Sequence, residues 1–449
     1  MNKIFEAQKA FFRTNETKSY SFRKAQLLRL REQILLHEED IINALYQDLH
    51  KSRYEAYATE IGLVLKSIRI ALRQLKRWMK PTKVKTPLFM LNTTSYIAHE
   101  PLGAILIIGP YNYPFQLVIE PLIGAIAAGN TAILKPSEQT PHVEDILVQM
   151  IQMCFPSDYV HVVTGDHLVT QELLALPFDH IFFTGSTHVG QIVYEAASKH
   201  LTPVTLELGG KSPTIVDATA KLKIAARRIA FGKFINAGQT CIAPDYLYVQ
   251  DTIKDEFLKL LHEAVSSFTS YDEAFGHIVN DKHMKRLLGL LPEQYKPSIN
   301  ESTESLLLRP VILPNATWND AIMKEEIFGP ILPVISYHTI DEVITQISHQ
   351  EQPLALYLFS RDKQIQKRIW SELSFGGGAI NDTVMQFSNM NLPFGGVGHS
   401  GIGQYHGKHT FHLFSHHKST IKRSNLWDPP ITYPPHTSWK ERLVRWILK

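Results

Sequence analysis

The sequence has little of what marks several common classes of protein. Its two cysteines, Cys154 and Cys241, lie far apart, so they make a poor disulfide framework and no zinc motif. We therefore expect a reducing compartment, the cytoplasm. The 24 Gly and 25 Pro are too few for a low-complexity or collagen-like chain. The longest apolar runs, such as Ala104–Pro110, fall far short of the about 20 residues that span a bilayer.

An excess of charge of one sign is also missing. The 46 Lys and Arg residues against 43 Asp and Glu residues leave a net charge of +3. This balance gives no indication of a nucleic-acid or membrane partner. The length of 449 residues instead suggests two or three domains, each large enough to bury a core.

Periodic apolar patterns predict an α/β protein. Residues Ser21–Lys76 predict two amphipathic helices. From residue 104 onward, short apolar runs alternate with stretches of helical length, as in βαβ units around a buried parallel sheet. A second α/β set has helical pattern at Ile253–Phe268 and Ile340–Ile347, and Thr410–Ile421 alternates as a strand does. The candidate strands are Ala104–Ile108, Thr131–Leu134, Val160–Val163, Ile181–Phe183, Val204–Leu208, Tyr246–Val249, Leu354–Ser360 and Gly378–Asn381. We predict two α/β domains and a projecting strand element.

Three glycine motifs bear on a cofactor. The G-x-G-x-x-G at Gly396–Gly401 lacks the acidic residue expected about 20 positions on, so we interpret it as a glycine-rich loop. The Gly-Lys-Ser that starts at Gly210 lacks the first glycine of a phosphate-binding loop. By contrast, an apolar strand leads through Gly185 and Ser186 into a helical stretch whose free N–H groups suit a pyrophosphate. An ordinary tight turn between a strand and a helix gives the same pattern.

Cys241 is the candidate nucleophile. It ends the segment Asn-Ala-Gly-Gln-Thr-Cys, where small neighbours let a carbonyl group approach the sulfur. Thiolate is the reactive form, and free N–H groups at a helix or turn favour it. Cys154 falls on the apolar stripe of a predicted helix, so we expect it to be inert core.

Glu207 and Asn112 are candidates for a general base and an oxyanion donor. Glu207 ends an apolar strand and precedes two glycines, where partial desolvation raises the pKa of a carboxyl group. It could instead form an ion pair with Lys211. Asn112 follows the first strand, and its amide could donate to negative charge developing on an oxygen. A turn-forming asparagine is the alternative.

Together these segments resemble the aldehyde dehydrogenase superfamily. The short N-terminus and the tail Pro-Pro-Ile-Thr-Tyr-Pro-Pro resemble its class 3, or fatty-aldehyde, branch in bacteria. The motifs occur in the family's order over nearly the whole chain. They are Gly-Pro-Tyr-Asn-Tyr-Pro around Asn112, Gly-Asn-Thr-Ala-Ile-Leu-Lys-Pro-Ser-Glu ending at Glu138, Phe-Thr-Gly-Ser ending at Ser186, Leu-Glu-Leu-Gly-Gly-Lys around Glu207, Asn-Ala-Gly-Gln-Thr-Cys ending at Cys241, Glu-Glu-Ile-Phe-Gly-Pro around Glu326 and Pro-Phe-Gly-Gly around Phe394.

The resemblance implies NAD(P)-dependent oxidation of an aldehyde to the carboxylic acid. Cys241 would attack the carbonyl carbon to form a thiohemiacetal, and Asn112 with the N–H of Cys241 would hold the oxyanion. Glu207 would activate the water that hydrolyses the thioester left after hydride transfer. NAD, with NADP tolerated, would contact Lys135, Glu138, Gly185, Ser186, Gly190, Glu326 and Phe328. The substrate would be a medium- or long-chain aliphatic, an aromatic or an apocarotenoid aldehyde.

The resemblance also implies a domain organisation. A Rossmann-like cofactor domain would comprise residues 1–80 and 100–207, and an α/β catalytic domain residues 208–395. Strands in 81–99 and 396–425 would join two copies in a homodimer, and 426–449 would be a tail. Acylating dehydrogenases that use coenzyme A commonly lack a glutamate at the place of Glu207, so the presence of Glu207 argues against this alternative. A non-catalytic binding protein with this fold would not need all three of Cys241, Glu207 and Asn112.

A run of histidines raises the question of a metal. His406, His409, His412, His416 and His417 recur at spacings that could place metal ligands on a helix. The alternation instead predicts a strand, which would put His412 and His416 on one face and His409 and His417 on the other. We therefore predict no metal site.

The tail Ser438–Lys449 predicts a short amphipathic helix. Trp439, Leu443, Trp446 and Ile447 form one apolar face, and the other side chains are mostly basic. The helix could dock on its own protein or on a dimer partner. It could also rest on anionic lipid as a weak peripheral contact, or rim the substrate tunnel.

Overall fold

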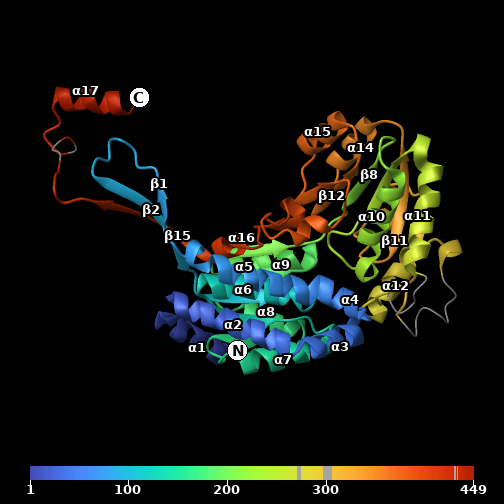
Figure 1. Cartoon of the computed structure of the whole chain (residues 1–449), viewed down its shortest axis with the longest axis horizontal. Helices are drawn as coiled ribbons and strands as arrows, with labels where there is room; N and C mark the ends of the chain where they lie inside the picture. The colour runs from blue at the N-terminus through green and yellow to red at the C-terminus, as the bar shows by residue number, and fades with distance from the viewer. Residues whose placement is uncertain (270–274, 297–305, 429–430, 432, 449) are drawn as a thin grey trace.

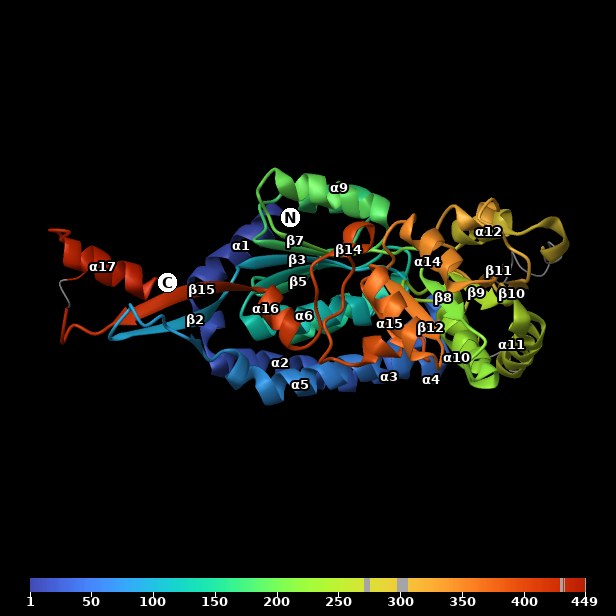
Figure 2. The same ribbon diagram turned by 90° about the horizontal axis from the view of Figure 1, so that it is seen from above.

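The computed structural model describes residues 1–269, 275–296, 306–428, 431 and 433–448. Within these residues the chain forms two six-stranded sheets and a three-stranded sheet. The two larger sheets lie side by side along the molecule, and the smaller one projects from the body beside the first (Figure 1, Figure 2). The predicted α/β class and the projecting strand element are confirmed.

The first sheet has the order β14-β7-β6-β3-β4-β5, and its strands are parallel except for β14. Ile105 and Ile107 on β3 join the core beneath α6 (Gln116–Ala128), whereas Leu106 joins the core beneath α9 (Thr187–Ser198). Alternate side chains thus fill opposite faces, as in a sheet buried on both sides. The five strands predicted for this part of the chain are present. The strands of the first sheet are β3 (Ala104–Ile108), β4 (Thr131–Lys135), β5 (Val160–Val162), β6 (His180–Thr184), β7 (Val204–Glu207) and β14 (Gly401–Ile402).

The second sheet has the order β10-β11-β9-β8-β12-β13 and is parallel throughout. The predictions found β9, β12 and β13 but not β8, β10 and β11. Pro213 begins β8 and Pro333 lies inside β11, and proline weakens a strand pattern because it has no N–H to donate. The strands are β8 (Pro213–Val216), β9 (Tyr246–Gln250), β10 (Val311–Leu313), β11 (Ile331–Tyr337), β12 (Ala355–Phe359) and β13 (Gly377–Ile380).

Helices cover both large sheets. The predicted helices at Ile253–Phe268 and Ile340–Ile347 are confirmed as α11 and α14. Cys154 ends α7 and is buried in the core, as predicted. The helices around the first sheet include α1 (Asn2–Arg13), α7 (Pro141–Cys154) and α8 (His167–Leu174), and those around the second are α10 (Leu222–Phe234), α11 (Lys254–Thr269), α12 (Asp281–Leu290), α14 (Ile340–Ser348) and α15 (Lys363–Glu372).

The N-terminal helical region contains more helices than predicted. Where two were expected, the chain forms α2 (Tyr20–Leu36), α3 (Glu38–Leu49), the short α4 (Arg53–Ala56) and α5 (Gly62–Trp78), with a π-helical turn before α5. The break between α2 and α3 falls at His37, which leaves helical geometry. Apolar spacing continues across this residue, so periodicity alone could not locate the break.

The third sheet is antiparallel and has the order β1-β2-β15. Its strands are β1 (Thr82–Val84), β2 (Thr93–Pro101) and β15 (Ser415–Arg423). The predicted strand Thr410–Ile421 is confirmed from Ser415 onward as β15, but its first part was wrong, because Lys408–Leu413 forms helix α16. Phe411 and Phe414 are both fully buried at a helical spacing, and the alternation of polar and apolar residues hid that pattern.

The chain ends in the predicted helix, α17 (Ser438–Ile447). It lies beyond the three-stranded sheet, away from both large sheets (Figure 1). Trp439 and Trp446 are 50% and 76% exposed. Among the described residues, no helix is long and apolar enough to cross a membrane.

Candidate functional site

The candidate residues converge where the two large sheets meet. Asn112 follows β3, Ser186 follows β6, and Glu207 is the last residue of β7, so all three lie at the carboxyl edge of the first sheet. Cys241 and Glu326 instead precede β9 and β11, at the amino edge of the second sheet. Chain order reverses at β3, which lies between β4 and β6. Such a switch point is where open parallel sheets bind ligands.

Cys241 lies in a constrained loop between α10 and β9. Asn236, Ala237 and Gly238 have φ values of 52°, 52° and 73°, and the first two are strained there because they carry a Cβ atom. A Cβ atom on Gly238 would lie 2.3 Å from the carbonyl oxygen of Gly329, so the loop packs directly on the segment before β11. The Cys241 side chain remains partly accessible.

The electrostatics around Cys241 favour the protonated thiol. Burial raises its pKa, and the nearby carboxyl groups of Glu326 and Glu207 raise it further. Hydrogen bonds from the backbone N–H groups of Cys241 and Ile242 act in the opposite direction. A base must therefore take the proton before the sulfur can act as a nucleophile.

Glu207 is buried and has no partner for its charge. Neither carboxyl oxygen accepts a hydrogen bond from any described residue, and burial raises its pKa well above the usual value. The alternative of an ion pair with Lys211 is wrong. Lys211 Nζ binds Asp245 Oδ2 at 2.5 Å and the carbonyl oxygen of Glu325 at 2.8 Å. The Glu207 carboxyl group is therefore left for another function.

Asn112 is more than a turn residue, because both its backbone and its side chain are tied to the cysteine loop. Its Nδ2 donates to the carbonyl oxygen of Gln239 at 2.9 Å, two residues before Cys241. Its own carbonyl oxygen accepts from Asn236 Nδ2 at 2.8 Å. An amide nitrogen carries two hydrogens, so one remains for a further acceptor.

A buried ion pair that the sequence analysis missed supports Asn112. Lys51 Nζ donates to the Asn112 carbonyl oxygen at 2.9 Å and to Glu60 Oε1 at 2.5 Å. Glu60 Oε2 accepts the backbone N–H groups of Phe115 and Gln116, at the start of α6. Lys51 and Glu60 are both fully buried. No local motif marks them, because Lys51 follows α3 and Glu60 lies in the π-helical turn before α5, and both meet the Asn112 loop only in the folded chain.

Glu326 lies against the glycines that follow Glu207. A Cβ atom on Gly209 would lie 1.9 Å from Glu326 Oε2, so only glycine leaves room for this carboxyl group. Burial, with Asp245 nearby, raises the pKa of Glu326 to about 8. Arg286, which the sequence analysis also missed, donates to the carbonyl oxygen of Glu326 at 3.3 Å.

Phe328 precedes β11 of the second sheet, and Lys135 ends β4 of the first. Phe328 has a φ of 48°, and its ring makes an edge contact with Tyr111, with centroids 5.8 Å apart. Lys135, at the end of β4, is buried, and its Nζ approaches Glu138 Oε2 at 3.4 Å. Glu138 is 45% exposed on its side chain, so it can also meet a ligand.

The turn from β6 to α9 leads directly into the N-terminus of a helix. The exposed Ser186 caps α9 by accepting from the N–H of Val189 at 3.4 Å. Gly190 lets α9 approach closely, since a Cβ atom there would lie 2.5 Å from Leu208 Cδ2. Gly185, at the turn itself, donates its N–H to the carbonyl oxygen of Glu207 at 3.0 Å. An open helix N-terminus at the switch point fits a pyrophosphate.

Comparisons with known proteins agree with this geometry. Residues 1–420 match the model of the Aldehyde dehydrogenase family. The chain is 52% identical over 439 residues to the 4,4'-diaponeurosporen-aldehyde dehydrogenase of Staphylococcus aureus, covering 96% of both chains. It is 40% identical over 444 residues to the dimeric NADP-preferring aldehyde dehydrogenase of Canis lupus familiaris, covering 97% of this chain and 98% of that one.

A solved structure is similar over the whole chain. It is the substrate-bound state of Staphylococcus aureus AldH, which matches with a TM-score of 0.97 at 50% identity. The match covers 100% of this chain and 99% of that chain. Family, sequence relatives and fold therefore agree. The chain belongs to the aldehyde dehydrogenase family and is an NAD(P)-dependent aldehyde dehydrogenase.

Proposed function

We propose that Cys241, Glu207 and Asn112 carry out the oxidation. The observation that supports this is their convergence at one point between the sheets, with a buried Glu207 that has no partner among the described residues. Cys241 Sγ attacks the aldehyde carbon once its thiol proton has passed to water. Glu207 acts after hydride transfer, and because burial raises its pKa, its carboxylate form is a strong base toward the hydrolytic water.

The negative charge that develops on the aldehyde oxygen meets two donors. One is the Nδ2 hydrogen of Asn112 that is not given to Gln239, and the other is the backbone N–H of Cys241. Lys51 and Asn236 hold the Asn112 carbonyl and so fix the direction of the amide. Preorganised donors of this kind stabilise a tetrahedral species at low cost in reorganisation.

NAD(P), when bound, accepts the hydride. Ser186 and Gly185 would hold the pyrophosphate at the N-terminus of α9, with Gly190 allowing α9 to lie close. Lys135 and Glu138 would meet the adenosine ribose, and Glu326 with Phe328 would hold the nicotinamide end. The thioester then left on Cys241 is hydrolysed when Glu207 takes a proton from water and the hydroxide adds to the acyl carbon. The C–S bond then breaks, which releases the carboxylic acid and returns the sulfur to Cys241.

We propose a medium- or long-chain aliphatic, an aromatic or an apocarotenoid aldehyde as the substrate. The name of the Staphylococcus aureus relative supports the last of these. A panel of aldehydes of graded chain length, with one apocarotenoid aldehyde, tests the proposal by kcat/KM with each cofactor. We expect kcat/KM to rise with chain length. A preference for short, hydrophilic aldehydes would contradict the proposal.

The covalent step has its own test. After brief mixing with aldehyde and NAD, acid quenching and digestion, mass spectrometry should find the acyl group on the Cys241 peptide. Cys154, buried in α7, serves as an internal control within the same sample. An acyl group on another residue, or none under conditions of rapid turnover, would contradict Cys241 as the nucleophile.

We also propose a homodimer formed through the projecting sheet, with the domain boundaries given above. β15 is an edge strand of that sheet, and its outer edge offers backbone groups to a second chain. Light scattering should give twice the chain mass of 51.1 kDa. Ile421→Pro, which removes an N–H on β15, should shift the protein toward the monomer. A monomeric wild-type protein would contradict this proposal.

A further inference from the structure

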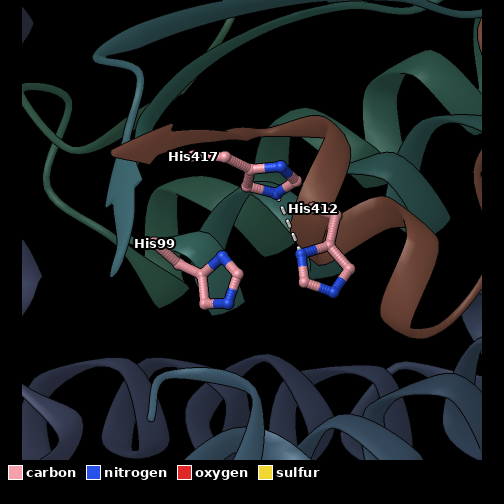
Figure 3. Close-up of side chains that lie close together, drawn as sticks. All are labelled: His99, His412 and His417. Atoms are coloured by element: carbon pink, nitrogen blue, oxygen red, sulfur yellow. Dashed lines mark hydrogen bonds between the residues drawn. The ribbon is translucent and has the colours of Figure 1, made fainter. Parts of the chain in front are cut away.

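Three histidine rings meet where the projecting sheet leaves the body of the molecule. His99 on β2 and His417 on β15 are direct partners across the antiparallel pair. His412 lies in the last turn of α16, just before β15 begins. Figure 3 shows the three rings around a common centre, although they come from three elements. None of them belongs to the catalytic site.

The rings are close enough to share one ion. Their centroids are 4.7 Å apart for His99 and His412, 5.1 Å for His99 and His417, and 5.0 Å for His412 and His417. One nitrogen of each ring lies within 4.8 Å of the others. His412 Nδ1 and His417 Nε2 are 3.1 Å apart. Two nitrogens on a tetrahedral zinc ion are about 3.4 Å apart, so small ring rotations would complete the site.

The chemistry of the three rings also suits a metal. Imidazole nitrogen is a common ligand for zinc, cobalt, nickel and copper ions. His99 Nδ1 is buried and has no hydrogen-bond partner among the described residues. Buried polar atoms are rarely left in this state.

The charges nearby limit which ion can bind. Burial is the main cause that lowers the pKa of both His99 and His412, and the neighbouring histidines and Lys408 lower it further. Glu100 is already paired with Lys418 at 2.9 Å, so it does not provide a carboxylate ligand. The site thus offers three nitrogens and no negative charge. Such a ligand set favours a transition-metal ion over calcium or magnesium, which prefer oxygen.

We propose that His99, His412 and His417 bind a divalent transition-metal ion of the zinc class, with water completing the coordination. The ion links α16 to both long strands of the projecting sheet and so fixes the angle at which that sheet leaves the body. The prediction of no metal site assumed a strand that would separate His412 from His417. Helix α16 removes that separation, and His99 was not among the histidines considered.

The test is a titration of the full-length, untagged protein with Co²⁺ after treatment with a chelator. A Cys241→Ser background removes the accessible thiol as a competing ligand. Tetrahedral Co²⁺ absorbs visible light, so the titration gives both the stoichiometry and the geometry of the site. Zn²⁺ added afterwards should displace Co²⁺ and abolish the absorption.

We expect one Co²⁺ ion per chain in the parent protein. His412→Ala and His417→Ala should each weaken binding at least tenfold, because even the loss of a residue behind a metal ligand costs about 10- to 100-fold. His409→Ala and His416→Ala are matched controls from the same segment and should bind as the parent does. Zn²⁺ should raise the Tm of the parent and of both controls, but not of the ligand variants.

Three results would overturn the proposal. They are the absence of stoichiometric binding to the parent, unchanged binding in both ligand variants, and equal losses in the ligand and control variants. Circular dichroism establishes that each variant is folded. If His412→Ala does not fold, His412→Gln keeps a polar side chain of similar size and gives the same comparison.

Discussion

Two buried glutamates, Glu60 and Glu207, differ in what surrounds them. Glu60 accepts from Lys51 at 2.5 Å and from two backbone N–H groups of the loop that carries Asn112. Glu207 accepts from none of the described residues. A paired carboxylate fixes the structure around it, whereas an unpaired one is costly to ionise, so its ionised form binds a proton strongly. Burial alone therefore does not distinguish a candidate base from a structural glutamate. The hydrogen-bond partners of each carboxyl group make that distinction.

The largest effect on activity should come from removing the sulfur of Cys241. Cys241→Ala should lower kcat at least about 10⁴-fold, because no other group can form the covalent intermediate. Cys154→Ala is the matched control and should keep nearly full activity, since that thiol is buried in α7. Steady-state oxidation of a medium-chain aldehyde measures both. Substantial turnover by Cys241→Ala would contradict a thioester route.

Removing the cation that pairs with Glu60 should mainly lower the free energy of unfolding. Lys51→Met leaves the Glu60 charge buried without its cation, which should cost about 3–5 kcal/mol in the free energy of unfolding. It should also lower kcat, because the Asn112 carbonyl loses a donor. Denaturant titration measures the first effect and steady-state kinetics the second.

The double variant makes this prediction sharper. Lys51→Met with Glu60→Gln should recover much of the stability, because the unpaired charge is gone. Lys66→Met removes an exposed lysine from neighbouring α5 and should change little. Equal losses in Lys51→Met and Lys66→Met would show that the buried pair has no special role.

A smaller effect is expected at the cofactor. Glu138, half-exposed beside Lys135, would accept from a ribose hydroxyl and repel a phosphate at that position. Glu138→Gln should shift the ratio of kcat/KM values toward NADP by about fivefold, since a surface charge pair about 4 Å apart is worth about 1 kcal/mol. Glu144→Gln, on α7, is the control. An unchanged ratio would place Glu138 away from the ribose.

The smallest effect concerns the tail, which lies far from both glutamates. Deleting Ser438–Lys449 should leave activity on short aldehydes intact and raise KM a few-fold for long-chain ones. Any binding to anionic liposomes should vanish with the deletion and weaken with salt. The exposed Trp439 and Trp446 are the side chains expected to touch lipid. Equal losses of activity on short and long substrates would instead indicate that the helix only stabilises the folded protein.

The sequence predicted the elements whose signals are local. Five of the six strands of the first sheet were found because Gly, Pro, Asn or Asp bounds each apolar run, whereas the two-residue β14 was not. Cys241 was singled out because of its small neighbours. Lys51 and Glu60 were missed because they are polar residues whose burial is decided by packing between distant segments. The proximity of His99 to His412 and His417 was missed for a related reason, since His99 is separated from His412 by most of the chain.

The direct test of the account is pre-steady-state kinetics of Glu207→Gln. If Glu207 is the base for thioester hydrolysis, this variant should still give a rapid burst of reduced cofactor, close to one per active site, followed by steady turnover slowed about 10²- to 10⁴-fold. Glu60→Gln should not separate the two phases. Steady turnover by Glu207→Gln at the wild-type rate would contradict the account, because another group would then be the base.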